Sequence, residues 1–309
     1  MTGAGHIDHK HGLYGGRMRD VICRRLRTSR TIVALAAMWV VMQPPGPAAS
    51  AEGARSREIV RYDNVEIDLV AEGRGPLIVM LPSRGRDSED FDDVASRLAA
   101  AGYRVLRPQP RGAGRSTGPL EGIRMQDLAR DVAHVIAREN AGPAVIAGHA
   151  FGNWVARMTA TDHPALVRGV VLMAAAAKAY PEELRAVVQQ AADTGLPDDQ
   201  RLAALRKGFF LPAHDATAWL HGWAPAANKA QSVAVSATKQ AEYWQAGTVP
   251  MLDLVPEGDP FKPKGKWNES REEFGDRVSV VVIPNASHAL IPEQPGAVVD
   301  AVVAWIAKL

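Results

Sequence analysis

The chain has 309 residues, of which 47% are hydrophobic and 23% charged, and its formal net charge is +2. This balance predicts a globular protein with a packed core, and the absence of a fixed repeat or a low-complexity segment argues against a repeat or fibrous architecture. Seven Lys and Arg and only two Asp lie in the first 51 residues, so the remainder is slightly negative and shows no electrostatic footprint for nucleic acid.

The first 51 residues read as a secretory signal. A basic stretch from Arg17 to Arg30 precedes an apolar run from Thr31 to Met42, and Ala49-Ser50-Ala51 follows as a cleavage site. The apolar run is shorter than the roughly 20 residues that span a bilayer, which argues against the alternative of an uncleaved membrane anchor. No stable membrane insertion is expected after cleavage. We therefore expect residues 1–51 to be a signal peptide and the protein to be periplasmic or secreted. The route of export, general or twin-arginine, stays open.

The next elements are two strands followed by an alternation of strands and helices. Residues 58–62 and 65–72 alternate apolar and polar side chains around Asp63-Asn64, which predicts a half-buried antiparallel pair. Further strands are predicted at 77–81, 103–106, 144–147 and 167–173, and helices at 90–101, 125–139 and 151–161. This order predicts an α/β fold with a mostly parallel twisted sheet and helices on both faces.

The alternation is interrupted after residue 176. Short helices are expected at 182–192, 198–207, 216–221 and 226–238, before strands at 250–255 and 278–283 and a last helix at 294–308. We therefore expect a core formed by residues 52–176 and 248–309, with residues 177–247 inserted as a helical cap.

One strand-to-helix turn carries a motif. Gly148-His149-Ala150-Phe151-Gly152 follows a buried strand and opens a helix. It resembles the nucleophile elbow, G-x-S-x-G, of the α/β-hydrolase superfamily, and Ala150 stands at the nucleophile position. An alanine side chain has no atom that can attack a carbonyl, so covalent catalysis through residue 150 is excluded on chemical grounds.

The resemblance extends over about residues 61–309. Pro256-Glu257-Gly258-Asp259 resembles the family's acid turn, and Ser287-His288 lies where the family has its histidine, in the order elbow, acid, histidine. The resemblance implies that Asp259 orients His288 as a general base, and that the backbone N–H groups of Arg84 and Phe151 form an oxyanion hole. Two departures stand out, because Pro82-Ser83 replaces His-Gly and Pro256 replaces glycine.

Other residues are candidates for substrate binding. Ser83 is the one hydroxyl that its loop is expected to place near the missing nucleophile, and nothing visible activates it. Arg84 and Arg86 either bind a substrate carboxylate or are solvated loop charges. The aromatic candidates for an apolar pocket under the cap are Trp154, Trp219 and Trp244. His149 is expected to pack behind the elbow. The histidines after residue 51 lack metal-ligand spacing, so no metal and no cofactor is expected.

Three functions remain open. The first is an enzyme that hydrolyses an ester, lactone or similar carbonyl compound, with His288 acting on water. The second is a serine hydrolase whose serine has been changed to alanine. The third is a non-catalytic protein that binds a small molecule. A small-molecule partner is common to all three, whereas the substrate and the oligomeric state stay open.

Overall fold

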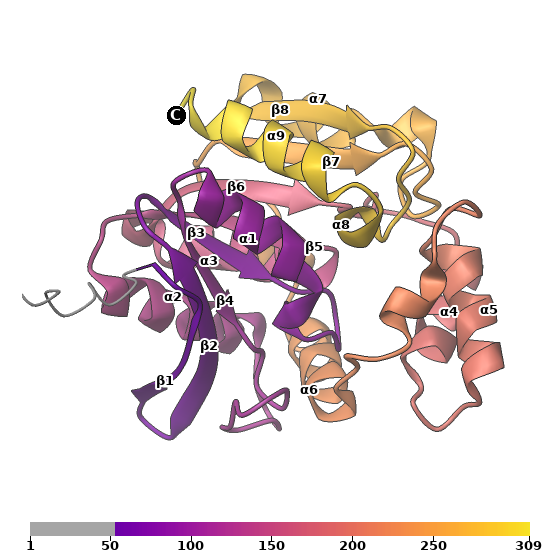
Figure 1. Cartoon of the computed structure of the whole chain (residues 1–309), viewed down its shortest axis with the longest axis horizontal. Coiled ribbons are helices and arrows are strands. Elements are labelled where there is room, and N and C mark those ends of the chain that lie inside the picture. The colour runs from indigo at the N-terminus through magenta and orange to yellow at the C-terminus, as the bar shows by residue number, and fades with distance from the viewer. Residues whose placement is uncertain (1–52) are drawn as a thin grey trace, which may run out of the picture. The chain divides into compact units, whose positions relative to one another are not determined.

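The computed structural model describes residues 53–309, which contain an eight-stranded sheet (Figure 1). The strand order is β1-β2-β4-β3-β5-β6-β7-β8; β1, β2 and β4 pair antiparallel, and β4 to β8 are parallel. The strands are β1 (Ser56–Tyr62), β2 (Val65–Gly73), β3 (Leu77–Leu81), β4 (Arg104–Pro108), β5 (Ala144–His149), β6 (Val167–Met173), β7 (Met251–Pro256) and β8 (Val278–Ile283). The predicted α/β fold with a mostly parallel sheet is confirmed. The predicted signal peptide lies outside the described residues and stays a prediction.

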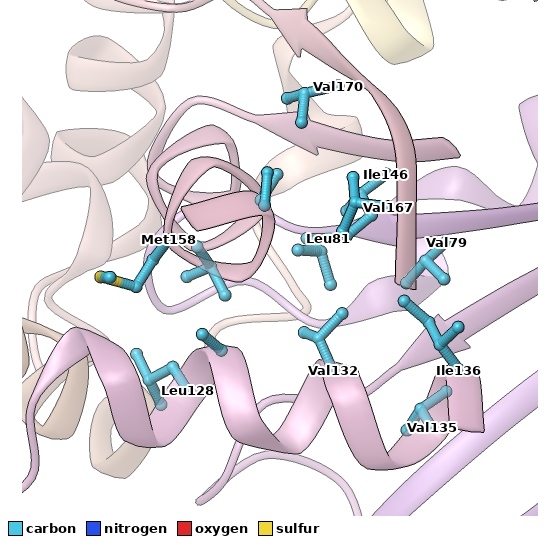
Figure 2. Close-up of a cluster of buried hydrophobic side chains, with 14 of the residues drawn as sticks. Val79, Leu81, Leu128, Val132, Val135, Ile136, Ile146, Met158, Val167 and Val170 are labelled. Atoms are coloured by element: carbon cyan, nitrogen blue, oxygen red, sulfur yellow. The ribbon is translucent and has the colours of Figure 1, made fainter. Parts of the chain in front are cut away.

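Helices cover both faces of the sheet. On one face lie α2 (Met125–Glu139), α3 (Phe151–Asp162) and α6 (Pro225–Ser236), and on the other lie α1 (Asp92–Ala100), α8 (Leu290–Glu293) and α9 (Pro295–Ile306). Figure 2 shows how α2 turns an apolar side toward the strands, with Leu128, Val132, Val135 and Ile136 facing residues of β3, β5 and β6. Burial on both sides explains why all five residues of β3 are apolar.

Strand β2 differs from its predicted half-buried state. Seven of its nine residues are buried, because β2 lies between β1 and β4 with a helix-covered face. Its Asp68 is fully buried, and Arg57 and Arg115 neutralise the carboxylate. A charged residue in the alternating pattern therefore marks a buried ion pair here and not a solvent-exposed face.

The segment between β6 and β7 is helical. It contains α4 (Glu183–Ala192), α5 (Asp198–Gly208), a 3₁₀ turn at Ala216–Trp219 and α6. In Figure 1, α4 and α5 lie beyond the end of the sheet toward which the β6 and β7 arrows point. Apolar side chains of this segment form their own cluster, which also includes Ala289 of the core. The helix predicted at 216–221 is thus only a short 3₁₀ turn.

Two helices near the C-terminus were not predicted. These are α7 (Glu269–Phe274) and α8, which is separated from α9 by Gln294; Pro295 is the first residue of α9. A proline at the first position of a helix is favourable, and it starts α9 one residue later than expected. Among residues 53–309, no helix is long and apolar enough to cross a membrane.

Candidate active site

The turn between β5 and α3 holds Ala150 in a strained backbone conformation. Its φ is 46° and its ψ is −112°, a region that costs a non-glycine residue about 1–3 kcal/mol. Flanking glycines impose this geometry, because a Cβ on Gly148 would lie 2.3 Å from the carbonyl carbon of Gly152. A Cβ on Gly152 would lie 2.2 Å from the Leu81 carbonyl oxygen. The elbow backbone is therefore fixed by close packing, whatever side chain stands at position 150.

Asp259 and His288 form a buried pair. The His288 Nδ1 atom lies 3.0 Å from Oδ2 and 3.2 Å from Oδ1 of Asp259, and the two residues are only 5% and 2% exposed. Oδ1 also accepts a hydrogen bond from the Phe261 N–H, which fixes the carboxylate. The neighbouring acid, Glu257, is exposed and makes no contact with the ring. An Nδ1–H held by a carboxylate leaves Nε2 as the basic nitrogen of a neutral imidazole.

Aromatic rings enclose the His288 imidazole. The ring centroid of Phe261 lies 4.4 Å away, that of Phe209 5.5 Å and that of His149 5.4 Å. Because these rings come from α5's C-terminal end, the acid turn and the elbow, three separate segments restrict the rotation of one side chain. The histidine is held in position before any ligand is present.

His149 is the residue behind the elbow and it remains neutral. Its Nε2 lies 2.8 Å from the backbone oxygen of His288, and its ring packs against Trp219. Burial, with a smaller effect of nearby His288, lowers the pKa of His149 to about 3. A neutral ring with its proton on Nε2 donates to that oxygen, so His149 supports the His288 backbone, as expected of a packing residue.

Ala150 and His288 line the same cavity. It offers about 630 Å³ of space between atoms, part of it open to solvent. Core residues supply one side and the segment between β6 and β7 supplies the other. The lining residues are Ser83, Arg84, Ala150, Phe151, Asn153, Trp154, Ala176, Tyr180, Val188, Phe209, Trp223, Phe261 and His288. A second hollow shares Phe151 but includes neither Ala150 nor His288.

Most of the predicted site residues converge on this cavity, but two do not. Ser83, Arg84, Phe151 and Trp154 line it together with Ala150 and His288, and Asp259 lies behind His288. Trp219 is only 2% exposed and packs between Phe209 and Phe210.

Trp244 is the second tryptophan outside the cavity lining. It is buried against the Arg157 guanidinium, 4.3 Å from its ring, and its Nε1 donates to Glu273 at 2.8 Å. The aromatic residues that sequence reasoning missed are Tyr180, Phe209, Trp223 and Phe261. Phe261 had an available signal, because it lies two residues after Asp259.

Two backbone N–H groups stand free beside Ala150. Phe151 is the first residue of α3, so no preceding helical turn accepts its N–H. Within residues 53–309 the Arg84 N–H has no hydrogen-bond partner, whereas the next two N–H groups bond to Gln231 and Ser83. Both residues line the cavity, so the arrangement offers donors to a substrate oxygen.

Arg86 is neither a solvated charge nor a ligand for a substrate. It is 1% exposed, and its Nε donates to Asp90 at 2.8 Å. Its Nη1 donates to the backbone oxygens of Trp219 and His221 at 3.3 and 2.5 Å. The guanidinium thus links the loop after β3 to the segment that carries Trp223.

Glu293 makes a second link of this kind. Its Oε2 accepts from the Ser287 N–H at 2.5 Å, and its Oε1 accepts from the Leu211 N–H at 2.7 Å. Burial raises the pKa of this carboxyl despite the two hydrogen bonds. One side chain therefore joins the turn before His288 to the segment after α5.

Among the described residues, no group of His, Cys, Asp and Glu is arranged to hold a metal ion.

Comparisons with known proteins identify similar sequences and folds. The sequence model of the alpha/beta hydrolase family matches residues 78–301. The 2-(acetamidomethylene)succinate hydrolase of Mesorhizobium japonicum is 29% identical over 112 residues, covering 36% of this chain and 40% of that protein. Epoxide hydrolase B of Mycobacterium tuberculosis is 34% identical over 106 residues, covering 34% of this chain and 30% of that protein. The chain thus aligns with less than half the length of either relative.

Solved structures share the fold over much longer stretches. The crystal structure of E-2-(acetamidomethylene)succinate hydrolase has a TM-score of 0.66 and 22% identity, covering 82% of this chain and 99% of that chain. The esterase from Exiguobacterium antarcticum has a TM-score of 0.68 and 19% identity, covering 81% of this chain and 98% of that chain. At these identities the likeness establishes the fold.

Proposed function

Because this chain belongs to the alpha/beta hydrolase family, we propose that it hydrolyses an ester, lactone or similar carbonyl compound without a covalent intermediate. One observation carries the proposal: the Asp259–His288 pair lies on the cavity beside Ala150, with Nδ1 held at 3.0 Å by the carboxylate. Within the described residues, His288 Nε2 has no hydrogen-bond partner. A base with a free nitrogen is therefore available where the family has its nucleophile.

The proposed reaction is general-base hydrolysis. His288 Nε2 takes a proton from a water molecule, and the water oxygen attacks the carbonyl carbon. The oxyanion of the resulting tetrahedral adduct accepts hydrogen bonds from the N–H groups of Arg84 and Phe151, each worth about 2.7–4 kcal/mol in comparable sites. When the adduct collapses, the bond to the leaving oxygen breaks and that oxygen takes the proton from His288. The products are a carboxylic acid and an alcohol, or a hydroxy acid from a lactone.

Asp259 has a supporting role in this scheme. Its carboxylate holds Nδ1–H and stabilises the imidazolium that forms during the reaction, without itself taking the proton. Ala150 contributes by its small size, because the methyl group leaves next to His288 the space that a hydroxyl-bearing side chain would fill.

The same elbow also supports the alternative of a serine hydrolase with its serine changed to alanine. The φ of 46° at Ala150 is maintained by Gly148 and Gly152, so a serine at this position would adopt the same backbone. That alternative differs from the proposal in one measurable respect, which is whether the alanine protein turns over a substrate.

The deciding experiment is a kinetic comparison of four proteins. The unaltered chain, Ala150→Ser, His288→Gln and the exposed control His221→Gln are assayed with p-nitrophenyl esters of increasing acyl length and with a panel of lactones. We expect steady turnover without a burst from the unaltered chain. His288→Gln should lower kcat roughly 10²–10⁴-fold, whereas His221→Gln should leave it unchanged.

Three results would overturn the proposal. Turnover that survives in His288→Gln would remove the general base. Turnover and a burst found only in Ala150→Ser would assign the site to the serine-hydrolase alternative. If no substrate of the panel is hydrolysed by either protein, the proposal fails for esters and lactones and the binding function is favoured.

A further inference from the structure

The cavity beside Ala150 has a one-sided charge. Its lining contains Arg84, whose charged group interacts electrostatically with Tyr180, another lining residue, and within the described residues it contains no Asp or Glu. The one carboxylate close behind the lining, Asp259, is fully buried and bonded to His288 and the Phe261 N–H. No acidic group of the site is therefore free to balance Arg84.

Arg84 is also without a partner elsewhere in the described part of the chain. Its side chain makes no hydrogen bond or ion pair with any of residues 53–309. Arg86, two residues away, is fully paired with Asp90 and two backbone oxygens, and Arg111 is paired with Asp131. The loop after β3 thus holds one arginine that serves the fold and one that does not.

Partial burial makes this lack of a partner costly. Loss of water contacts lowers the pKa of Arg84, and among residues 53–309 the one neighbouring group that opposes this effect is Tyr180, which also lines the cavity. A buried cation without a counter-charge destabilises a protein, and an anion in the cavity would relieve that cost. The planar guanidinium fork fits a carboxylate with two parallel hydrogen bonds.

The other lining residues indicate the chemistry of the uncharged part of such an anion. Six aromatic residues line the space, and they come from the core as well as from the segment between β6 and β7: Phe151, Trp154, Tyr180, Phe209, Trp223 and Phe261. Aromatic surfaces favour an apolar or aromatic ligand body. The cavity therefore combines an apolar space, one cationic group and the His288 ring.

We propose that this site binds carboxylate-bearing ligands, with the carboxylate on the Arg84 side chain and an apolar body among the aromatic residues. That such a ligand is the substrate, with its ester or lactone carbonyl near His288, rests on the proposed function. Arg84 then acts twice, through its backbone N–H on the reacting oxygen and through its side chain on the distant carboxylate.

The test measures binding, which does not require turnover. Calorimetry and tryptophan fluorescence compare 4-phenylbutyrate with its neutral isostere 4-phenylbutyramide. The proteins are the unaltered chain, Arg84→Gln, Arg84→Lys and the control Arg168→Gln, an exposed arginine on β6 outside the cavity lining. We expect the carboxylate to bind about ten- to a hundredfold more tightly than the amide to the unaltered chain and to Arg168→Gln. Arg84→Gln should remove the preference, and Arg84→Lys should keep part of it because the charge remains.

Equal affinity for acid and amide in the unaltered chain would overturn the inference, as would a preference that persists in Arg84→Gln. Folding of each variant is checked by its thermal unfolding, so that loss of binding is not loss of structure. A parallel assay compares the kcat/KM of p-nitrophenyl hemiglutarate with that of neutral p-nitrophenyl valerate. A carboxylate preference in binding without any turnover would contradict the proposed function and leave the carboxylate site standing. Turnover without such a preference would contradict the carboxylate site and leave the proposed function standing.

Discussion

The ring of His149 donates a hydrogen bond from Nε2 to the backbone oxygen of His288, across 2.8 Å and 139 positions of the sequence. This contact joins the elbow at the end of β5 to the turn that carries the proposed base. The ring that makes this contact is neutral, because burial among other rings disfavours the charged form more strongly than the hydrogen bond to the His288 oxygen favours it.

The buried neutral state of His149 predicts a pH dependence of stability. The pKa of His149 is about 3 in the folded protein and near 6.5 when unfolded. Between these values only the unfolded chain binds the proton, so the free energy of unfolding should fall as pH decreases, by about 1.4 kcal/mol per pH unit from this group. Urea unfolding at pH 7.5, 6, 5 and 4 measures the slope. In His149→Gln the free energy of unfolding should change less steeply with pH, by about 1.4 kcal/mol per pH unit, which is the contribution of one proton. In His221→Gln the slope should be unaltered. Identical slopes in all three proteins would contradict a neutral His149.

Glu293 should stabilise the fold by holding two backbone donors. In Glu293→Ala the N–H groups of Ser287 and Leu211 lose their acceptor inside the protein, so we expect the free energy of unfolding to fall by about 1–3 kcal/mol per unpaired donor. The exposed Glu257→Ala serves as the control and should change stability by less than about 0.5 kcal/mol. Denaturant unfolding followed by circular dichroism gives both values, and equal effects in the two variants would argue against the link.

The elbow glycines predict a strong and local sensitivity to a single methyl group. Gly152→Ala places a Cβ 2.2 Å from the Leu81 carbonyl oxygen, so β3 and α3 must move apart. We expect a loss of about 3 kcal/mol or more in the free energy of unfolding. Gly296→Ala, in α9, meets no atom within 4 Å and should be neutral or slightly stabilising. A thermal melt of each variant checks the contrast, which would disappear if the elbow were loosely packed.

Much of the fold was predictable from local patterns. The apolar run of β3, the apolar stretches 144–147 of β5 and 170–173 of β6, and the helical spacing in α2 each reflect burial that a short stretch of sequence determines. The motif around Ala150 was readable for the same reason, because Gly148 and Gly152 are needed where strand and helix backbones touch.

The cavity lining was less predictable, because contacts between distant segments determine it. Trp219 and Trp223 are four residues apart, yet the first packs between Phe209 and Phe210 and the second lines the cavity. Similarly, nothing in the local sequence distinguishes Arg84 from Arg86. The difference arises from the Trp219 and His221 carbonyls, more than 130 residues away, which accept hydrogen bonds from Arg86 and not from Arg84.

The positive φ at Ala150 also bears on how readily this site can change over evolutionary time. Alanine and serine codons differ by a single base at the first position, so a point mutation is enough to introduce a hydroxyl at residue 150. The backbone that would receive it is already held by Gly148 and Gly152, and its conformational strain is present with alanine as well. Exchange between the two residues therefore demands no compensating substitution in the elbow, and either form of the protein is an immediate genetic neighbour of the other.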